Sequence, residues 1–267
     1  MMRTRNSKKV LVVIIGAIVV SAPLLLMLPS TQPATEVKLT LLLNAGVMIE
    51  AKGLRIYIDP LYLSSNYTDL PADVILITHP HSDHYSRLDV ESVLTNDTLF
   101  VCPENMTDAI DRFDGFGVNP GDSFLIGDIN ITAFHLYLPD YPSGLPTFHP
   151  REANWTSFII DIDGFTIFHA GDTKYIDEYE ELRDTIDVAF LPIYFDPGLG
   201  PLNESLLPIV DSIDMIRPRT TILTHFTGPN RETFISEYSI LVEYTDGEIL
   251  NLEYYTTRIF IVDGNDT

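Results

Sequence analysis

The amino-acid sequence predicts one layered domain of the α/β or α+β class, preceded by a hydrophobic N-terminal segment. Two patterns indicate this class. Short β-type segments crowd the first part of the chain, and further strands then alternate with helices. Of the 267 residues, about 240 remain beyond the hydrophobic segment, which suits a single domain with a sizeable core.

The N-terminus has the features of a membrane anchor. A basic flank, residues 1–9, precedes the uncharged apolar run Val10–Leu28. As a helix with ~1.5 Å rise per residue, this run is about 28 Å long, close to the hydrocarbon thickness of a bilayer. The basic flank predicts that the N-terminus stays in the cytoplasm and that the domain lies outside the cell.

A cleavable signal peptide is the alternative interpretation of this segment. The small residues of Val20-Ser21-Ala22 suit cleavage, but Pro23 follows directly, and a cut there would leave the apolar stretch LLLML at the new N-terminus. We therefore favour an uncleaved anchor, with a secreted protein if cleavage does occur. A linker is expected over residues 29–36 and the folded domain over residues 37–267.

The expected strands of the first part are short and separated by turn signals. They cover residues 37–43 (VKLTLLL), 47–51 (VMIEA), 54–59 (LRIYID) and 73–78 (DVILIT). The last of these is almost entirely apolar, as expected for a strand buried on both faces. Further strands are expected over Ile131–Leu138, Ser157–Ile162, Phe165–Ala170, Val188–Ile193, Thr220–Thr224 and Arg258–Val262. Helices are expected over Arg87–Leu94, Met106–Phe113, Ile176–Arg183, Glu204–Ile213 and Glu232–Val242.

The charge of the domain excludes several partners. Beyond residue 30 there are 12 basic and 38 acidic residues, a formal charge of −26. Such a surface repels polyanions, so nucleic acid and anionic lipid surfaces are poor partners. An alternative role of this acidic charge is to keep the protein soluble, including in a medium of high salt. The single cysteine, Cys102, cannot form an internal disulfide, and a domain of this size can be exported without one.

Glycosylation sequons are a second indication of export. Seven of the 12 asparagines lie in Asn-X-Ser/Thr, an excess that N-glycosylation on an extracellular face would explain. The alternative is that Asn and Thr are enriched together in polar turns. The sequons are at Asn66, Asn96, Asn105, Asn130, Asn154, Asn203 and Asn265.

A histidine cluster follows the buried strand DVILIT. The stretch Leu76–Ser86, LITHPHSDHYS, holds His79, His81, Asp83 and His84, although the chain has only seven histidines. In extended chain, residues i and i+2 point the same way, so His79 and His81 can reach one metal ion. A turn can then direct Asp83 and His84 to a neighbouring point. These ligands suit zinc, and also iron or manganese.

The remaining ligands must come from farther along the chain. The four other histidines are His135, His149, His169 and His225. His225 ends the apolar run TTILT, and His149 lies in a loop, FHPREANW. Asp172 follows a strand and Gly171 in HAGDT, where glycine permits a close approach of the backbone. A carboxylate at this position can bridge two metal ions.

These motifs resemble the metallo-β-lactamase superfamily, whose hallmark is HxHxDH. FHAGDTKYIDE, DVAFLPI and ILTHF further resemble a branch of small metal-dependent hydrolases related to the ascorbate-6-phosphate lactonases. The resemblance covers Lys38 to His225. It implies a four-layer αβ/βα sandwich, with the active site in loops at the edges of the two sheets.

The resemblance also implies a ligand set for two divalent metal ions, preferably zinc, with manganese or iron as alternatives. The first ion would be held by His79, His81 and His149, the second by Asp83, His84 and His225, with Asp172 bridging them. His135 competes with His149 for the third position, and we favour His149, because an FHP shortly before an aromatic-rich strand and GDT is similar to this branch.

Three other positions qualify this set. His169 is expected to lie in the core or to orient a ligand. At Asn44, in LLLNAG, relatives of this branch often carry histidine, so the substrate class differs here if that residue contacts substrate. Tyr194, in a loop expected beside the site, is a candidate proton donor, preferred over Tyr85 and Lys174.

The predicted mechanism follows from two close cations. They lower the pKa of a bridging water, so that hydroxide is available near neutral pH to attack a carbonyl or phosphorus centre. One cation stabilises the developing oxyanion. Asp83 can accept a proton or orient the nucleophile, besides binding metal.

The sequence thus predicts a membrane-anchored, outward-facing hydrolase of a small ester, lactone or phosphodiester. Two alternatives remain. One is a non-catalytic metal-binding domain that serves as a cell-surface interaction module. The other is a nuclease or phosphodiesterase of the same fold, against which the acidic charge argues. A β-lactamase proper is disfavoured, because the resemblance runs to the lactonase-like branch.

Overall fold

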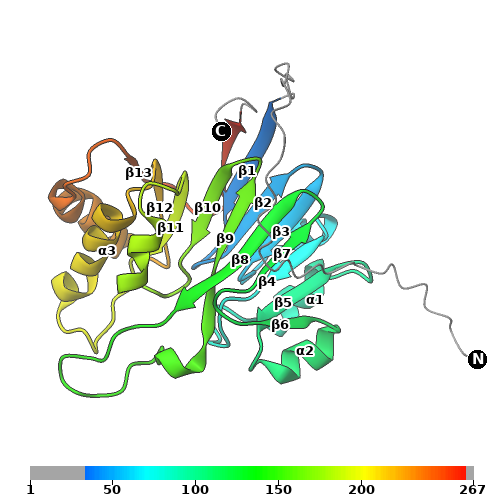
Figure 1. The fold of residues 1–267 in the computed structure, drawn as a ribbon, viewed down its shortest axis with the longest axis horizontal. Coiled ribbons are helices and arrows are strands. Elements are labelled where there is room, and N and C mark those ends of the chain that lie inside the picture. The colour runs from blue at the N-terminus through cyan, green and yellow to red at the C-terminus, as the bar shows by residue number, and fades with distance from the viewer. Residues whose placement is uncertain (1–33, 263–267) are drawn as a thin grey trace, which may run out of the picture.

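The computed structural model describes residues 34–262, which form two β-sheets packed face to face with helices on their outer sides (Figure 1). The predicted anchor over residues 10–28 and its basic flank lie outside the described residues. Within residues 34–262, no helix is long and apolar enough to cross a membrane.

The first sheet has seven strands and contains most of the N-terminal half of the chain. Its antiparallel part joins β14 (Thr256–Val262), β1 (Thr35–Leu41), β2 (Val47–Ala51) and β3 (Leu54–Ile58). From β3 onward the strands are parallel: β4 (Val74–Leu76), β5 (Leu99–Pro103) and β6 (Phe116–Val118). The first strand begins at Thr35, two residues inside the predicted linker.

The second sheet follows the same plan, again with seven strands. Its antiparallel part joins β7 (Ser123–Ile126), β8 (Ile129–Leu136), β9 (Trp155–Ile162) and β10 (Phe165–His169). Parallel pairing then continues through β11 (Val188–Pro192), β12 (Thr220–Thr224) and β13 (Glu248–Leu250).

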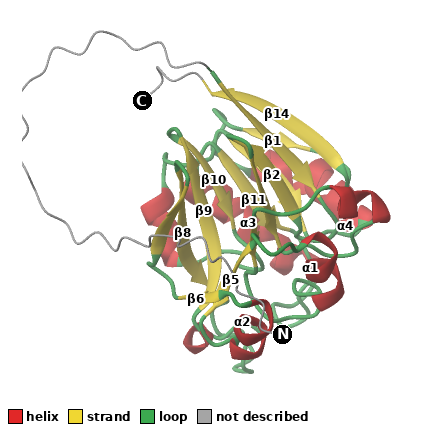
Figure 2. Cartoon of the chain, turned by 90° about the vertical axis from the view of Figure 1, so that its right-hand side faces the viewer, coloured by secondary structure: helices red, strands yellow, loops and turns green. Residues whose placement is uncertain are grey.

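Helices cover the outer face of each sheet. The first sheet carries α1 (Arg87–Val93), α2 (Thr107–Phe113) and a 3₁₀ turn at Ser65–Asp69. The second carries α3 (Leu202–Ile216), α4 (Gly228–Thr233) and a 3₁₀ turn at Asp177–Leu182. Figure 2 shows α1 and α2 below the strands of the first sheet and α3 behind the strands of the second. The predicted layered α/β sandwich of two sheets is confirmed.

Three apolar layers hold these elements together. Alternate residues of the strands point inward, so residues such as Leu39, Ile49, Phe158 and Ile160 fill the space between the sheets and are completely or almost completely buried. A second cluster joins the second sheet to α3, and a third joins the first sheet to α1 and α2. Burial on both faces explains why the strand containing β4 is nearly all apolar.

The structure differs from the predicted elements where strands are short or helices irregular. Strands β5, β6, β7 and β13 were not predicted: β6 and β13 have only three residues each. The helix expected at Glu232–Val242 instead begins as α4 at Gly228, where Pro229 suits a first helical turn. It continues as a π turn over Phe234–Tyr238 and a 3₁₀ turn over Ser239–Leu241.

The parallel strands determine where loops gather. Because β3, β4 and β5 run parallel, the residues that follow them lie at one edge of the first sheet, and those that follow β10, β11 and β12 lie at one edge of the second. The predicted ligand residues all come from loops at these ends or from the loop between β8 and β9.

Candidate metal centre

The loop after β4 is fixed by a buried carboxylate. Asp59, which directly follows β3 and is completely buried, accepts hydrogen bonds from the Thr78 backbone N–H (2.8 Å) and the Thr78 hydroxyl (2.5 Å). Its Oδ2 also lies 2.7 Å from His84 Nδ1. A hydrogen bond at Nδ1 leaves Nε2 of His84 free to face the site. Sequence reasoning missed Asp59, although an acidic residue closing the apolar strand LRIYID was a usable signal.

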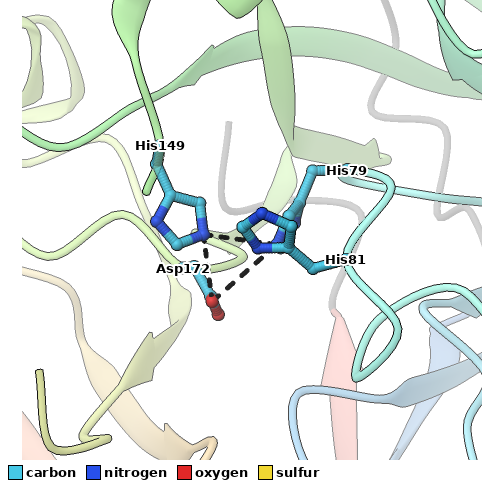
Figure 3. A group of neighbouring side chains, drawn as sticks. All are labelled: His79, His81, His149 and Asp172. Atoms are coloured by element: carbon cyan, nitrogen blue, oxygen red, sulfur yellow. Dashed lines mark hydrogen bonds and ion pairs between the residues drawn. The ribbon is translucent and has the colours of Figure 1, made fainter. Parts of the chain in front are cut away.

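A first group of possible ligands consists of His79, His81, His149 and Asp172 (Figure 3). Each offers an atom within 4.8 Å of the others. His149 Nε2 lies 3.3 Å from His79 Nε2 and 3.2 Å from Asp172 Oδ2. The structure therefore brings the strand-end histidines together with the loop between β8 and β9 and with the residue that follows β10 and Gly171.

A second group consists of Asp83, His84, His225 and the same Asp172. His225 Nε2 lies 3.2 Å from Asp83 Oδ2 and 3.5 Å from Asp172 Oδ1, and His84 Nε2 lies 2.8 Å from Asp172 Oδ1. Asp172 thus presents Oδ2 to the first group and Oδ1 to the second. This is the geometry that a bridging carboxylate requires.

The buried polar atoms of this cluster fit a divalent cation. His84 Nε2 and Asp172 Oδ1 are close, but their geometry is not that of a hydrogen bond, and neither atom has a hydrogen-bond partner among the described residues. Buried polar atoms normally have partners, because leaving them without one is costly. A cation between the imidazole nitrogens and the carboxylate oxygens would satisfy them.

The electrostatics of the cluster favour positive charge. Burial lowers the pKa of His79 and His81, so both imidazoles are neutral and can act as ligands. Burial opposes a charge on His84, but Asp172 and Asp59 raise its pKa well above the usual value. Burial likewise opposes ionisation of Asp172, yet His84 and His225 hold its pKa well below the usual value. The Asp172 carboxylate is therefore anionic and attracts a proton or a metal ion.

Comparison with known proteins shows which family the chain belongs to. The model of the family described as "Beta-lactamase superfamily domain" matches residues 40–226. This chain belongs to that family. The match includes every residue of the two ligand groups, and the predicted membership of the metallo-β-lactamase superfamily is confirmed.

The proteins that this chain resembles are named as metal-dependent hydrolases. A UPF0173 metal-dependent hydrolase of Anoxybacillus flavithermus is 34% identical over 185 residues, covering 63% of this chain and 79% of the relative. Another, from Lysinibacillus sphaericus, is 28% identical and covers 76% of this chain and 92% of the relative. A structure from Parabacteroides distasonis assigned as a metal-dependent hydrolase has a TM-score of 0.66 at 27% identity, covering 82% of this chain and 94% of that one.

The fold of the superfamily extends to more distant structures. Igni18, a metallo hydrolase of Ignicoccus hospitalis, has a TM-score of 0.63 at 22% identity and covers 84% of this chain and 98% of its own. That likeness concerns the fold alone. The family model and the relatives named above confirm the predicted membership of the small metal-dependent hydrolases of the superfamily.

The two remaining histidines of the chain, His135 and His169, lie outside the two candidate ligand groups. His135 lies on β8, half-buried against Phe134, with a ring-centroid distance of 5.6 Å. His169 is buried; its Nε2 donates to the Ala45 carbonyl (2.6 Å), and its Nδ1 accepts from the Gly171 N–H (3.2 Å). It therefore ties the Asn44–Gly46 loop to the loop that carries Asp172.

Asn44 contacts two metal-ligand loops. Its Nδ2 donates to the Asp83 carbonyl (2.7 Å), and its own carbonyl accepts from the His225 N–H (2.9 Å). Both contacts are to backbone atoms of second-group residues that come from different sheets. Asn44 thus connects these loops, through its side-chain amide on one side and its backbone carbonyl on the other.

The three candidate proton donors occupy different places. The Tyr194 hydroxyl donates to the Asp172 carbonyl (3.1 Å), and its ring lies 4.7 Å from that of His225. Lys174 is buried beneath it and donates to the carbonyls of Tyr194 (2.7 Å) and Ser205 (2.6 Å). Tyr85 lines a separate groove beside Trp155. Among these three, Tyr194 contacts the cluster most directly.

Proposed function

We propose that this chain is a dinuclear metal-dependent hydrolase of a small ester, lactone or phosphodiester. The observation that carries the proposal is Asp172, whose two carboxylate oxygens face two different ligand groups. The family and the names of its relatives support hydrolysis of this kind. The acidic chain, at −22 overall, supports a substrate other than nucleic acid.

The roles of the residues follow from their placement. His79, His81 and His149 would hold one ion, and Asp83, His84 and His225 the other. When bound, the ions supply Lewis acidity and lower the pKa of a water molecule. Five imidazoles with carboxylates suit zinc, and manganese or iron also accept such ligands.

Asp83 and Tyr194 are the proposed proton-handling groups. The Asp83 side chain is half exposed, and a hydrogen bond from His225 lowers its pKa, so it is a carboxylate able to accept a proton or to orient a nucleophile. Burial raises the pKa of Tyr194 well above 10, so its hydroxyl stays protonated. The leaving group would receive its proton from this hydroxyl, directly or through a water molecule.

We place the domain outside the cell, held by the N-terminal segment. Five of the six sequon asparagines in the described part of the chain are exposed: Asn66, Asn96, Asn105, Asn154 and Asn203. Strand β1 runs from Thr35 to Leu41, and the loop that follows it carries Asn44, which contacts Asp83 and His225. Thr35 therefore lies at the end of the strand away from these candidate ligands. An anchored domain could then present its site away from the membrane. Glycopeptide mass spectrometry of native protein should find glycans on exposed sequons, and unmodified asparagines throughout would contradict this part.

The central test combines metal analysis with activity. Purified wild-type protein should contain two metal ions per chain and hydrolyse some of a panel of model lactones, esters and bis-p-nitrophenyl phosphate. Asp172→Asn should reduce metal affinity by more than about 10–100-fold, the loss typical of residues that only orient a ligand, and lower activity with it. Asp128→Asn, at a side chain that is 88% exposed, is the matched control and should retain both.

Three outcomes would redirect the proposal. Protein with two bound ions that hydrolyses none of these substrates, and an Asp83→Ala variant altered only in stability, would indicate a metal-binding interaction module. Cleavage of DNA or RNA in place of the model compounds would indicate a nuclease. A single bound ion with full activity would contradict the dinuclear mechanism.

A further inference from the structure

A groove of about 430 Å³ lies beside the first ligand group, outside the set of metal ligands. It runs between the loop after β4, the start of α2 and the start of β9. Its walls include Pro80, Tyr85, Met106, Asp108, Ala153 and Trp155. This volume lies in the range of small-molecule sites in proteins, about 300–1,000 Å³.

The groove and the metal centre share a wall. The Trp155 indole lies 4.9 Å from the His81 ring, 5.3 Å from His79 and 5.7 Å from His149, measured between ring centroids. Pro80, which lines the groove, is the residue between His79 and His81 in the chain. A substrate held at the first ligand group can therefore extend along Trp155 into the groove.

The walls of the groove are fixed by a contact between distant segments. The Asn105 amide donates to the Ala153 carbonyl (2.6 Å), which joins the turn before α2 to the turn before β9. Met106 is only 7% exposed and Ala109 only 3%, so their side chains form a packed floor. This arrangement is formed before any ligand arrives, as is usual for small-molecule sites.

The chemistry of the lining selects for an uncharged group. Among residues 34–262, Asp108 is the only charged residue that lines the groove, and it is exposed; no lysine or arginine of this part of the chain lines it. An anionic substituent would meet this carboxylate and the negative field of the whole domain. Tryptophan, methionine and proline instead offer apolar contact surface to an aromatic or aliphatic group.

We propose that this groove binds an uncharged aryl or acyl portion of the substrate while the scissile bond lies at the metal ligands. This inference rests on the proposed hydrolase function and narrows its substrates to those esters, lactones or phosphodiesters that carry an uncharged, apolar aryl or acyl substituent. Substrates that would place a charged substituent in the groove become poor substrates.

Trp155 allows a direct binding test, because it is the only tryptophan of the chain. Zinc-loaded, full-length protein is titrated with phenylacetamide, which is neutral, and with benzenesulfonate, which carries the same ring with a negative charge. Phenylacetamide should change the Trp155 fluorescence saturably and bind at least about fivefold more tightly than benzenesulfonate, the effect expected of one nearby solvated charge.

Charge reversal localises the effect. Asp108→Lys should remove the preference for phenylacetamide or reverse it by a similar factor, about fivefold. Asp111→Lys is the matched control: Asp111 is exposed on the same helix, α2, and does not line the groove. This control should keep the wild-type preference, and circular dichroism should show that both variants are folded.

The binding readout separates this inference from the proposed function. Saturable binding of phenylacetamide without any hydrolysis of esters would contradict the hydrolase and leave the groove as a ligand site. Hydrolysis without a fluorescence response to phenylacetamide would overturn the groove assignment alone. Equal binding of the two probes, or equal effects of Asp108→Lys and Asp111→Lys, would also overturn it.

Discussion

At the scale of single residues, Asn44 connects two of the loops that carry candidate metal ligands. It has a left-handed backbone, with φ of 59°, which asparagine tolerates better than most residues. Its amide and carbonyl connect the backbones of Asp83 and His225. The sequence had raised contact with substrate as the role of this position; the structure gives its side-chain amide a contact within the protein.

Two substitutions at Asn44 separate the effect of its side-chain amide from the effect of its backbone conformation. Asn44→Gly retains the left-handed conformation and Asn44→Asp retains the size, but neither can donate to the Asp83 carbonyl. Both should weaken binding of the second metal ion by about 10–100-fold and leave the first ion bound. Competition titrations with a chromophoric chelator measure the two affinities.

The matched control is Asn154→Gly, at another left-handed asparagine (φ 49°) with an exposed side chain. It should leave the affinity for the second ion unchanged. Wild-type affinity in both Asn44 variants would show that the amide contact does not position the second ligand group.

The single cysteine gives a pH prediction at the same scale. Cys102 is completely buried on β5, and burial raises the pKa of its thiol to about 12 from 9.0. The unfolded chain therefore ionises this thiol from about pH 9, while the folded chain holds it neutral. The buried, neutral thiol therefore makes its full contribution to folding stability below pH 9. As the pH rises towards 12, the free energy of unfolding falls by up to about 4 kcal/mol.

Cys102→Ala isolates this effect, because the variant lacks the thiol but keeps every other titrating group. The difference in unfolding free energy between wild type and Cys102→Ala should shrink between pH 8 and pH 11, as measured by urea denaturation. A difference that stays constant over this range would contradict the assigned pKa. Iodoacetamide should likewise label the thiol only after unfolding.

At the scale of elements, the turn after β10 depends on Gly171. Its φ is +59°, and a Cβ there would lie 2.5 Å from Leu136 Cδ1 and 3.2 Å from Thr78 Cβ. Gly171→Ala should therefore destabilise the protein by about 1–3 kcal/mol and weaken metal binding, because Asp172 is the next residue.

Gly53→Ala is the control for backbone strain alone. Gly53 also has a positive φ, +75°, but no atom lies within 4 Å of a Cβ built there. It should cost about 1–2 kcal/mol without changing metal affinity. If Gly171→Ala bound metal as tightly as Gly53→Ala, the close approach at Gly171 would not position Asp172.

The strands and helices also show which elements can be predicted from sequence patterns and which cannot. The apolar run DVILIT and the alternating strands were predictable because burial on one or two faces leaves a periodic signature. Strands β6 and β13 were not, since three residues are too few for any period. The 3₁₀ turn at Asp177–Leu182 was predicted as a helix, because its apolar spacing does not distinguish a tight turn from an α-helix.

At the scale of the whole molecule, the candidate metal ligands come from both sheets. His79, His81, Asp83 and His84 follow the first sheet, whereas His149, Asp172 and His225 belong to loops of the second. A bound ion would therefore stabilise the sandwich as a whole. At a free ion concentration 100 times the dissociation constant, the gain is about 2.7 kcal/mol per site.

Chelation should accordingly lower the unfolding temperature, and zinc should restore it, as followed by calorimetry. Asp172→Asn should show a much smaller shift on chelation, because it lacks the shared carboxylate. Removal of metal from the wild type without any change in unfolding temperature would contradict a link between the sheets through the ions.

The sequence by itself determined the family of this protein and half of its candidate metal site. Ligand types and local spacing are written in consecutive residues, so His79, His81, Asp83 and His84 could be identified as one half of a site, and apolar periodicity was enough for a layered fold. The tertiary structure placed His149, which the sequence already favoured over His135, among the candidate ligands. It alone decided that Asp59 contacts His84 and that Trp155 lies beside both the histidines and a groove. These facts depend on which strands become neighbours, and strand order arises from contacts between residues far apart in the chain.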